Sequence, residues 1–110
     1  MSLIQEVEAA ELAALKESGD AVRIIDIRQP AELNAGIIPS AEALPMHLIP
    51  LRMDELKRDE KLIMVCRSGA RSAQACMFLQ QQGYENVYNL RGGMMAWSGS
   101  GFEIGMPQAV

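Results

Sequence analysis

The sequence of 110 residues is 49% hydrophobic and 22% charged, which is the composition of a folded protein and argues against a long disordered chain. Its length suits one domain with a hydrophobic core and is too short for two. The net charge of -4 disfavours a nucleic-acid partner, which needs a basic surface. The acidic excess lies in residues 1–60, whereas residues 61–110 hold 4 basic and 2 acidic side chains.

The chain has two cysteines and one histidine, which limits its metal and disulfide chemistry. Two cysteines do not make the disulfide framework of a small secreted protein, and a closed four-ligand zinc site needs more ligands. No charged and then apolar leader opens the sequence, and no apolar run reaches the roughly 18 residues that cross a bilayer. We therefore predict a cytoplasmic protein with no membrane partner, no metal and no cofactor.

Apolar runs and turn residues predict strands that alternate with helices. In chain order, we expect a strand at 4–7, a helix at 8–17, a strand at 22–26, a short helix at 30–33, a loop at 36–40, an edge strand at 43–45, a helical segment at 46–56 interrupted at Pro50, a strand at 61–65, a helix at 70–82, a strand at 87–90, a short helix at 93–97 and an extended C-terminal tail at 102–110. This alternation is typical of an α/β domain with a mainly parallel central sheet, flanked by helices on both faces.

Cys66 stands where a predicted buried strand ends and a polar loop leads into a helix. Unpaired backbone N–H groups and the positive end of the helix dipole favour an anion there, and Arg67 and Arg71 add positive charge. Gly69 lets successive N–H groups turn into one cradle. We therefore expect the pKa of Cys66 to lie below its ordinary value, so that the residue acts as a nucleophile. The alternative is an inert buried thiol.

Several motifs resemble those of one known family. The segments "CRSGARSAQA", "LQQQGYENVYNLRGG" and "MMAW" resemble the second half of a single-domain rhodanese-like sulfurtransferase. In the first half, "IIDIRQPAEL" and "AGIIPSAEALPM" resemble the family's Asp-x-Arg and Pro-x-Glu segment and its Gly, Ile-Pro and Ala loop. The resemblance implies a single rhodanese-like domain over residues 1–110, with its core at about 4–101.

The resemblance also implies a sulfurtransferase of the thiosulfate type. The Cys66 thiolate would take the outer sulfur of thiosulfate, release sulfite, and pass the sulfur from a persulfide to cyanide or a thiol. The loop that binds the sulfur anion would comprise Arg67, Ser68, Gly69, Ala70, Arg71 and Ser72. Arg67 would attract the donor and Arg71 would brace the loop.

Two other functions remain open for the same motif. One is a persulfide relay between proteins, including a sulfur-carrier protein, which the exposed sulfur of a shallow loop would favour. The other is a binding or regulatory module without catalysis. A phosphatase is disfavoured, because related phosphatase-type domains place five residues between cysteine and arginine, whereas four separate Cys66 from Arg71.

Other polar residues have both a functional and a structural interpretation. Asp26 and Arg28 end a predicted central strand, where they can face the loop, but Arg28 and Glu32 can equally form a structural ion pair at i+4. Cys76, about two turns into the helix, is expected in the core. His47 is expected at the surface or rim rather than in a Cys/His dyad.

The last predicted helix is rich in large apolar side chains. Met94 and Met95 follow two glycines, and Trp97 comes two residues later. We expect all three to fill the core, with an apolar rim for a protein partner as the alternative for the methionines.

Overall fold

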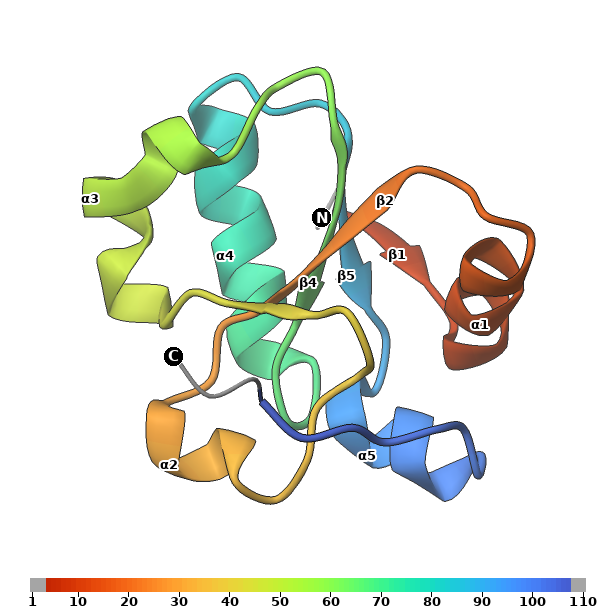
Figure 1. Ribbon diagram of the computed structural model, residues 1–110. Coiled ribbons are helices and arrows are strands. Elements are labelled where there is room, and N and C mark those ends of the chain that lie inside the picture. The colour runs from red at the N-terminus through yellow and green to blue at the C-terminus, as the bar shows by residue number, and fades with distance from the viewer. Residues whose placement is uncertain (1–3, 108–110) are drawn as a thin grey trace.

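The computed structural model describes residues 4–107, and within them one five-stranded sheet carries helices on both faces (Figure 1). The strands are β1 (Gln5–Val7), β2 (Val22–Asp26), β3 (Glu42–Ala43), β4 (Lys61–Val65) and β5 (Val87–Leu90). The helices are α1 (Ala9–Glu17), α2 (Pro30–Leu33), α3 (Ile49–Arg52), α4 (Ala70–Gln81) and α5 (Gly93–Gly99), with 3-10 turns η1 (Met46–Leu48) and η2 (Met53–Glu55). The strand order is β1-β5-β4-β2-β3, and every neighbouring pair is parallel. The predicted α/β fold is confirmed.

Alternating side chains of the central strands divide the core into two layers, because successive residues of a strand point to opposite faces. Ile25 and Met64 pack with residues of α3 and α4, whereas Ile24 and Ile63 pack with residues of α1 and α5. Figure 1 shows these two pairs of helices on opposite sides of the sheet. Each of these side chains is at most 2% exposed, and burying one contributes about 1.5–3 kcal/mol to stability.

β1, α1 and α4 are each one residue shorter than predicted, and three other elements differ by more. The edge strand lies at Glu42–Ala43, earlier than expected. The segment 46–56 breaks before Pro50, because that proline occupies the first turn of α3, where its missing N–H leaves no hydrogen bond unmade. Helix α5 continues to Gly99, beyond the expected end at residue 97.

The carboxyl edge of the sheet is where several chain segments converge (Figure 1). The strands β2, β4 and β5 lead there into α2, α4 and α5. The described part of the tail runs along the loop after α2, with a bridge between Gly105 and Ile37. Residues 102–107 of the predicted tail form no helix, and residues 108–110 lie outside the described range. Parallel sheets bind ligands at this edge.

Candidate active site

The loop after β4 surrounds the sulfur of Cys66 with hydrogen-bond donors. Sγ accepts the backbone N–H of Gly69 at 3.1 Å and that of Ser72 at 3.4 Å, and the Ser72 hydroxyl lies 3.3 Å away. Gly69 has a φ of +97°, in the left-handed region that favours glycine, and this turns its N–H towards the sulfur. The loop therefore directs three hydrogen-bond donors at Sγ, an arrangement that would stabilise negative charge there.

These donors change the acidity of the thiol. Burial raises the pKa of Cys66, but the hydrogen bonds from the Ser72 hydroxyl and from the backbone N–H groups of Ser72, Gly69 and Ser68 lower it by more. The pKa of Cys66 therefore lies below the ordinary value of 9.0, as predicted. The main favourable cause is hydrogen bonding rather than the two arginines. Cys66 is also 0% exposed, so the expectation of an exposed sulfur is wrong: the loop closes over it.

Arg71 is engaged by a carboxylate from another helix. Its guanidinium donates to both oxygens of Glu32, at 3.0 and 2.8 Å, and so joins α4 to α2. Hydrogen bonds from Arg71 and from the backbone N–H of Gln29 lower the pKa of Glu32 to about 2. Because its charge is neutralised in this way, Arg71 braces the loop rather than offering a free cation.

Arg67 occupies a different environment, beside an open cavity of about 400 Å³ between α2 and α5. The cavity is also lined by Arg28, Glu32, Ala35, Gly36, Met94, Met95 and Ser98. Within residues 4–107, Arg67 takes part in none of the ion pairs. Its guanidinium is therefore available to an anion that enters the cavity.

Asp26 and Arg28 form a buried ion pair at the end of β2. The guanidinium of Arg28 donates to both carboxylate oxygens of Asp26, and the side chains are only 5% and 1% exposed. Arg28 also donates to the backbone oxygens of Glu32 and Gly36. The prediction of a side-chain ion pair between Arg28 and Glu32 is therefore wrong. Residues two apart on an extended chain share a face, so the carboxylate of Asp26 lies nearer to the Arg28 guanidinium than that of Glu32 does. The contacts of Arg28 fix the turn after β2.

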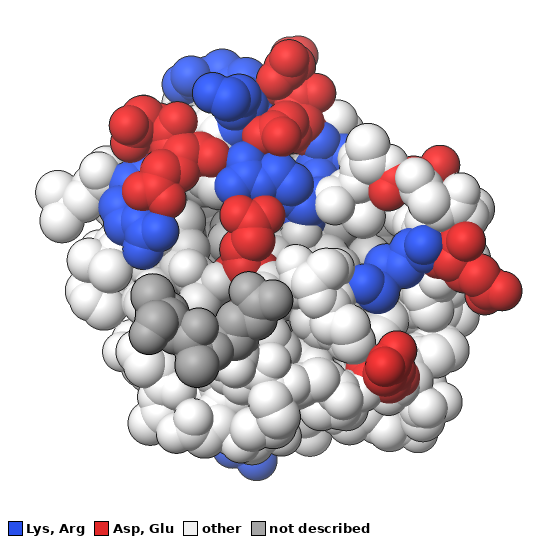
Figure 2. All heavy atoms as spheres, viewed as in Figure 1, with Lys and Arg blue, Asp and Glu red and all other residues white. Residues whose placement is uncertain are grey.

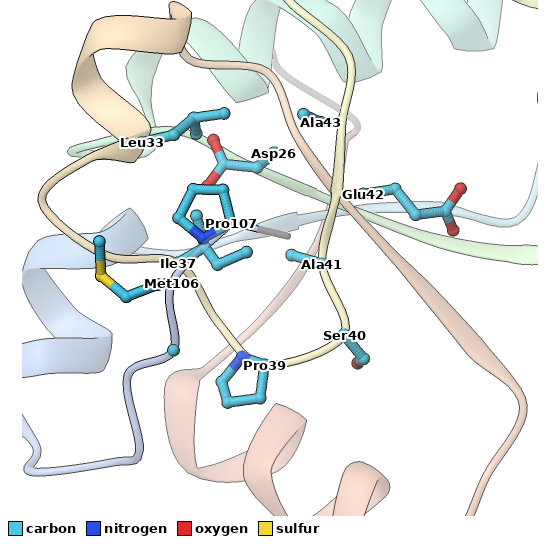
Figure 3. Close-up of a pocket in the computed structure, with 11 residues that line it drawn as sticks. Asp26, Leu33, Ile37, Pro39, Ser40, Ala41, Glu42, Ala43, Met106 and Pro107 are labelled. Carbon is cyan, nitrogen blue, oxygen red and sulfur yellow. The ribbon is translucent and has the colours of Figure 1, made fainter. Parts of the chain in front are cut away.

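A second, larger cavity of about 590 Å³ lies between the loop after α2 and the tail. Figure 3 shows the Asp26 carboxylate in it, between Leu33 and Pro107. None of residues 66–72 lines this cavity, so it is separate from the Cys66 loop.

The remaining candidates fall in different surroundings. Cys76 is 0% exposed, and burial raises its pKa to about 12, which confirms its place in the core. His47 is exposed on η1, and no described hydrogen bond joins it to Cys66. Met94 is buried as expected, but Met95 is 60% exposed beside the cavity, so its prediction as a core residue is wrong. It lies on the outer side of the first turn of α5.

The start of α5 closes the back of the loop. The backbone N–H of Met94 donates to the Cys66 carbonyl at 2.9 Å, and that of Met95 donates to the Arg67 carbonyl at 3.0 Å. Gly93 has a φ of +57°, and a Cβ there would overlap these two carbonyl groups. The Gly-Gly pair of the sequence thus lets α5 approach the loop backbone closely.

Sequence reasoning missed Asn89, a buried polar residue of β5 that is 2% exposed. The Ser72 hydroxyl lies within hydrogen-bond distance of its Oδ1. Its Nδ2 donates to the Gly69 carbonyl at 3.1 Å and to the carboxylate of Glu6 at 3.0 Å. A polar residue inside an otherwise apolar strand is the signal that would have found it, because buried polar groups need partners.

Charges elsewhere are of mixed sign. Figure 2 shows acidic and basic side chains interleaved over the upper part of one face, and Arg23 forms ion pairs with both Glu42 and Glu60. In the part of the chain from 4 to 107, no group of three His, Cys, Asp or Glu side chains is placed to hold a metal ion. Among the described helices, none combines the length and the apolar character that crossing a membrane requires.

Comparison with known proteins links this geometry to one family. The family model described as a Rhodanese-like domain matches residues 8–100. A protein of Allochromatium vinosum named sulfurtransferase is 47% identical over 106 residues, which are 96% of this chain and 99% of that protein. A thiosulfate sulfurtransferase of Pseudoalteromonas translucida is 39% identical, over 84% of this chain and 88% of that one. The crystal structure of a rhodanese-related protein from Thermoplasma volcanium superimposes with a TM-score of 0.85 at 30% identity, covering 94% of this chain and 99% of that chain.

Proposed function

This chain belongs to the family of rhodanese-like domains, and from that premise we propose that it transfers sulfur from thiosulfate, or a related persulfide donor, to cyanide or a thiol through a persulfide on Cys66. The observation that carries the proposal is the convergence of three donors on Sγ, which lowers the pKa of this thiol. The thiolate, not the thiol, is the nucleophile in displacement at sulfur. The reaction would take place in the reducing cytoplasm, with residues 1–110 acting as one unit.

The transfer consists of two displacements that need no oxidant and no proton. The Cys66 thiolate attacks the outer sulfur of thiosulfate, the S–S bond of the donor breaks, and sulfite leaves with the bonding electron pair. The negative charge then lies on the outer sulfur of the persulfide. Cyanide or a thiolate attacks this sulfur in turn, takes it away as thiocyanate or a new persulfide, and restores the Cys66 thiolate.

The backbone and the side chains of the loop would have separate roles in the transfer. The N–H groups of Gly69 and Ser72 stabilise the negative charge on Sγ before attack. Arg67 attracts the dianionic donor and neutralises the departing sulfite, because its guanidinium forms no ion pair within residues 4–107. Because Cys66 is 0% exposed, the loop must open to admit the outer sulfur of the donor.

A thiocyanate assay tests this proposal. We expect wild-type protein to form thiocyanate from thiosulfate and cyanide, and Cys66→Ser to form none. Replacing Arg67 with Ala should raise KM for thiosulfate about tenfold or more, because a hydrogen bond to a charged group contributes about 1.5–3 kcal/mol. Arg91→Ala is the matched control, since Arg91 is also an exposed arginine but pairs with Glu8 at 3.4 Å. Activity that survives in Cys66→Ser would refute the persulfide route.

A persulfide relay between proteins is the second candidate function. The exposed side chain of Met95, next to Arg67 in the cavity, offers an apolar contact to a protein that delivers or removes sulfur. Faster transfer to the thiol of a sulfur-carrier protein than to cyanide would support the relay. Efficient turnover with cyanide and none with a carrier protein would count against it.

A further inference from the structure

The hydrogen bonds of Asn89 determine how its side-chain amide is oriented. The backbone oxygen of Gly69 and the carboxylate of Glu6 both lie within reach of one end of the amide, at 3.1 and 3.0 Å. Both groups only accept hydrogen bonds, so the NH₂ end must face them. The oxygen Oδ1 therefore faces Ser72, where it acts as an acceptor.

The Ser72 hydroxyl consequently stands between two acceptors. Its oxygen lies within hydrogen-bond distance of Asn89 Oδ1 and 3.3 Å from Cys66 Sγ. A hydroxyl has only one proton to donate. When Cys66 is a thiolate, Sγ and Oδ1 compete for that proton; when Sγ is uncharged, the proton is free to bond to Oδ1.

We propose that Asn89 is a positioning residue for sulfur transfer. The Ser72 hydroxyl turns between two acceptors, Cys66 Sγ and Asn89 Oδ1, as Sγ gains and loses negative charge. This inference rests on the proposed function and deepens it. In the thiolate, Ser72 donates to Sγ. Once the persulfide has formed, Sγ is bonded to the outer sulfur and uncharged, and Ser72 donates to Asn89 instead. Only the O–H bond direction changes, and no proton is transferred.

The rotation of the Ser72 hydroxyl favours persulfide formation. Asn89 accepts the hydrogen bond of this hydroxyl whenever Sγ carries no charge, and so stabilises those states, the persulfide included. Of the hydrogen bonds that lower the pKa of Cys66, the one from the Ser72 hydroxyl has the largest effect, so diverting it to Asn89 has a measurable consequence. Asn89 and Ser72 are both at most 2% exposed, which keeps water from satisfying either acceptor in place of the hydroxyl.

Other charged and titratable groups also face this site. They are Arg67 in the loop, Arg71 and Cys76 on α4, Glu32 on α2, Asp26 and Arg28 at the end of β2, and Glu6 on β1. The variants below replace none of them, but Asn89→Leu removes a hydrogen bond from the Glu6 carboxylate in both backgrounds alike.

The test compares Asn89→Leu in two backgrounds, wild type and Ser72→Ala. The readout is the pH midpoint of Cys66 thiolate absorbance, taken as the difference between each protein and its Cys66→Ser counterpart. In wild type, Asn89→Leu removes the competing acceptor, so the midpoint should move to lower pH by roughly half to one pH unit. Ser72→Ala alone should move it to higher pH. In the Ser72→Ala background, adding Asn89→Leu should leave the midpoint in place.

Equal shifts of the midpoint in both backgrounds would overturn the proposal, since Asn89 would then act on the loop without Ser72. An unchanged or higher midpoint for Asn89→Leu in wild type would overturn it as well. The variant leaves the Gly69 carbonyl with its helical bond from the Ala73 N–H, at 3.1 Å. Should leucine prevent folding, Asn89→Val makes the same comparison with a smaller side chain suited to a strand. The titration needs no sulfur donor, so its outcome is independent of whether thiosulfate is the substrate.

Discussion

The ion pair between Glu32 and Arg71 gives a prediction about stability and pH. Glu32→Gln removes the carboxylate charge that engages Arg71 across the two helices. Taken alone, the fall in the pKa of Glu32 from 4.5 to about 2 corresponds to roughly 3 kcal/mol. The two side chains are 32% and 39% exposed, however, so solvent screens the pair. We therefore expect a loss of about 1 kcal/mol at neutral pH, the upper end for exposed pairs, because the contact is bidentate.

The sign of the pH dependence follows from the lowered pKa. A carboxylate with a depressed pKa stabilises the folded state fully above its unfolded value of 4.5, and this contribution is lost as the pH falls towards about 2. Urea unfolding of wild type and Glu32→Gln at pH 7 and at successively lower pH measures it. The difference in free energy of unfolding should be largest at pH 7 and shrink steadily below pH 4.5.

The matched control is Glu55→Gln, which breaks the more exposed Arg52–Glu55 pair of the same type. It should lower stability less than Glu32→Gln does. A difference for Glu32→Gln that stays constant from pH 7 down to the lowest pH would refute the reasoning, because the loss would then come from packing rather than from charge. A loss no larger than that of the control would also refute it.

Gly93, the buried ion pair of Asp26 and the two cysteines each give one further prediction. Gly93→Ala should abolish thiocyanate formation and lower the melting temperature, because the added Cβ would overlap the carbonyl groups of the loop. Gly99→Ala is the control and should change neither, because a Cβ there would have nothing within 4 Å. Equal effects of the two variants would contradict the close approach of α5. Asp26→Asn should lower the free energy of urea unfolding by about 3–5 kcal/mol, because it leaves a buried guanidinium without its carboxylate, and a loss below about 1 kcal/mol would argue against a structural role. In peptide-resolved alkylation near neutral pH, Cys66 should react and Cys76 should not. The reason is that the pKa of Cys66 is lowered, whereas that of Cys76 is raised to about 12. Faster alkylation of Cys76 than of Cys66 would exclude Cys66 as the nucleophile.

Features with a strong local signal were predictable from the sequence. The apolar runs inside β2 and β4 located both strands, because a strand buried on both faces is rich in apolar residues. The order of strand, cysteine, Gly-containing loop and helix located the cradle, since backbone N–H groups at that point have no other partner. The core position of Cys76 is confirmed, and it agrees with the tendency of unpaired cysteines to be buried.

Features that depend on contacts between distant segments were not predictable. Glu32 pairs with Arg71, which is 39 residues away in the sequence. No local pattern indicates that Glu32 pairs with Arg71 rather than with Arg28, which is closer in sequence. Asn89 reaches the loop from the neighbouring strand β5, and its three partners come from β1 and α4 and from the loop. The exposure of Met95 depends on how α5 packs against the loop, which the helical period alone does not determine.

The central claim is that Cys66 carries the transferred sulfur, and its most direct test is the mass of the Cys66 peptide after incubation with thiosulfate. We predict that this peptide gains the mass of one sulfur atom, that an equal amount of sulfite is released, and that cyanide removes the added sulfur as thiocyanate. The Cys76 peptide should gain nothing, and Cys76→Ser should leave the result unchanged. No added sulfur on Cys66, or added sulfur that persists in the Cys66→Ser protein, would contradict the account.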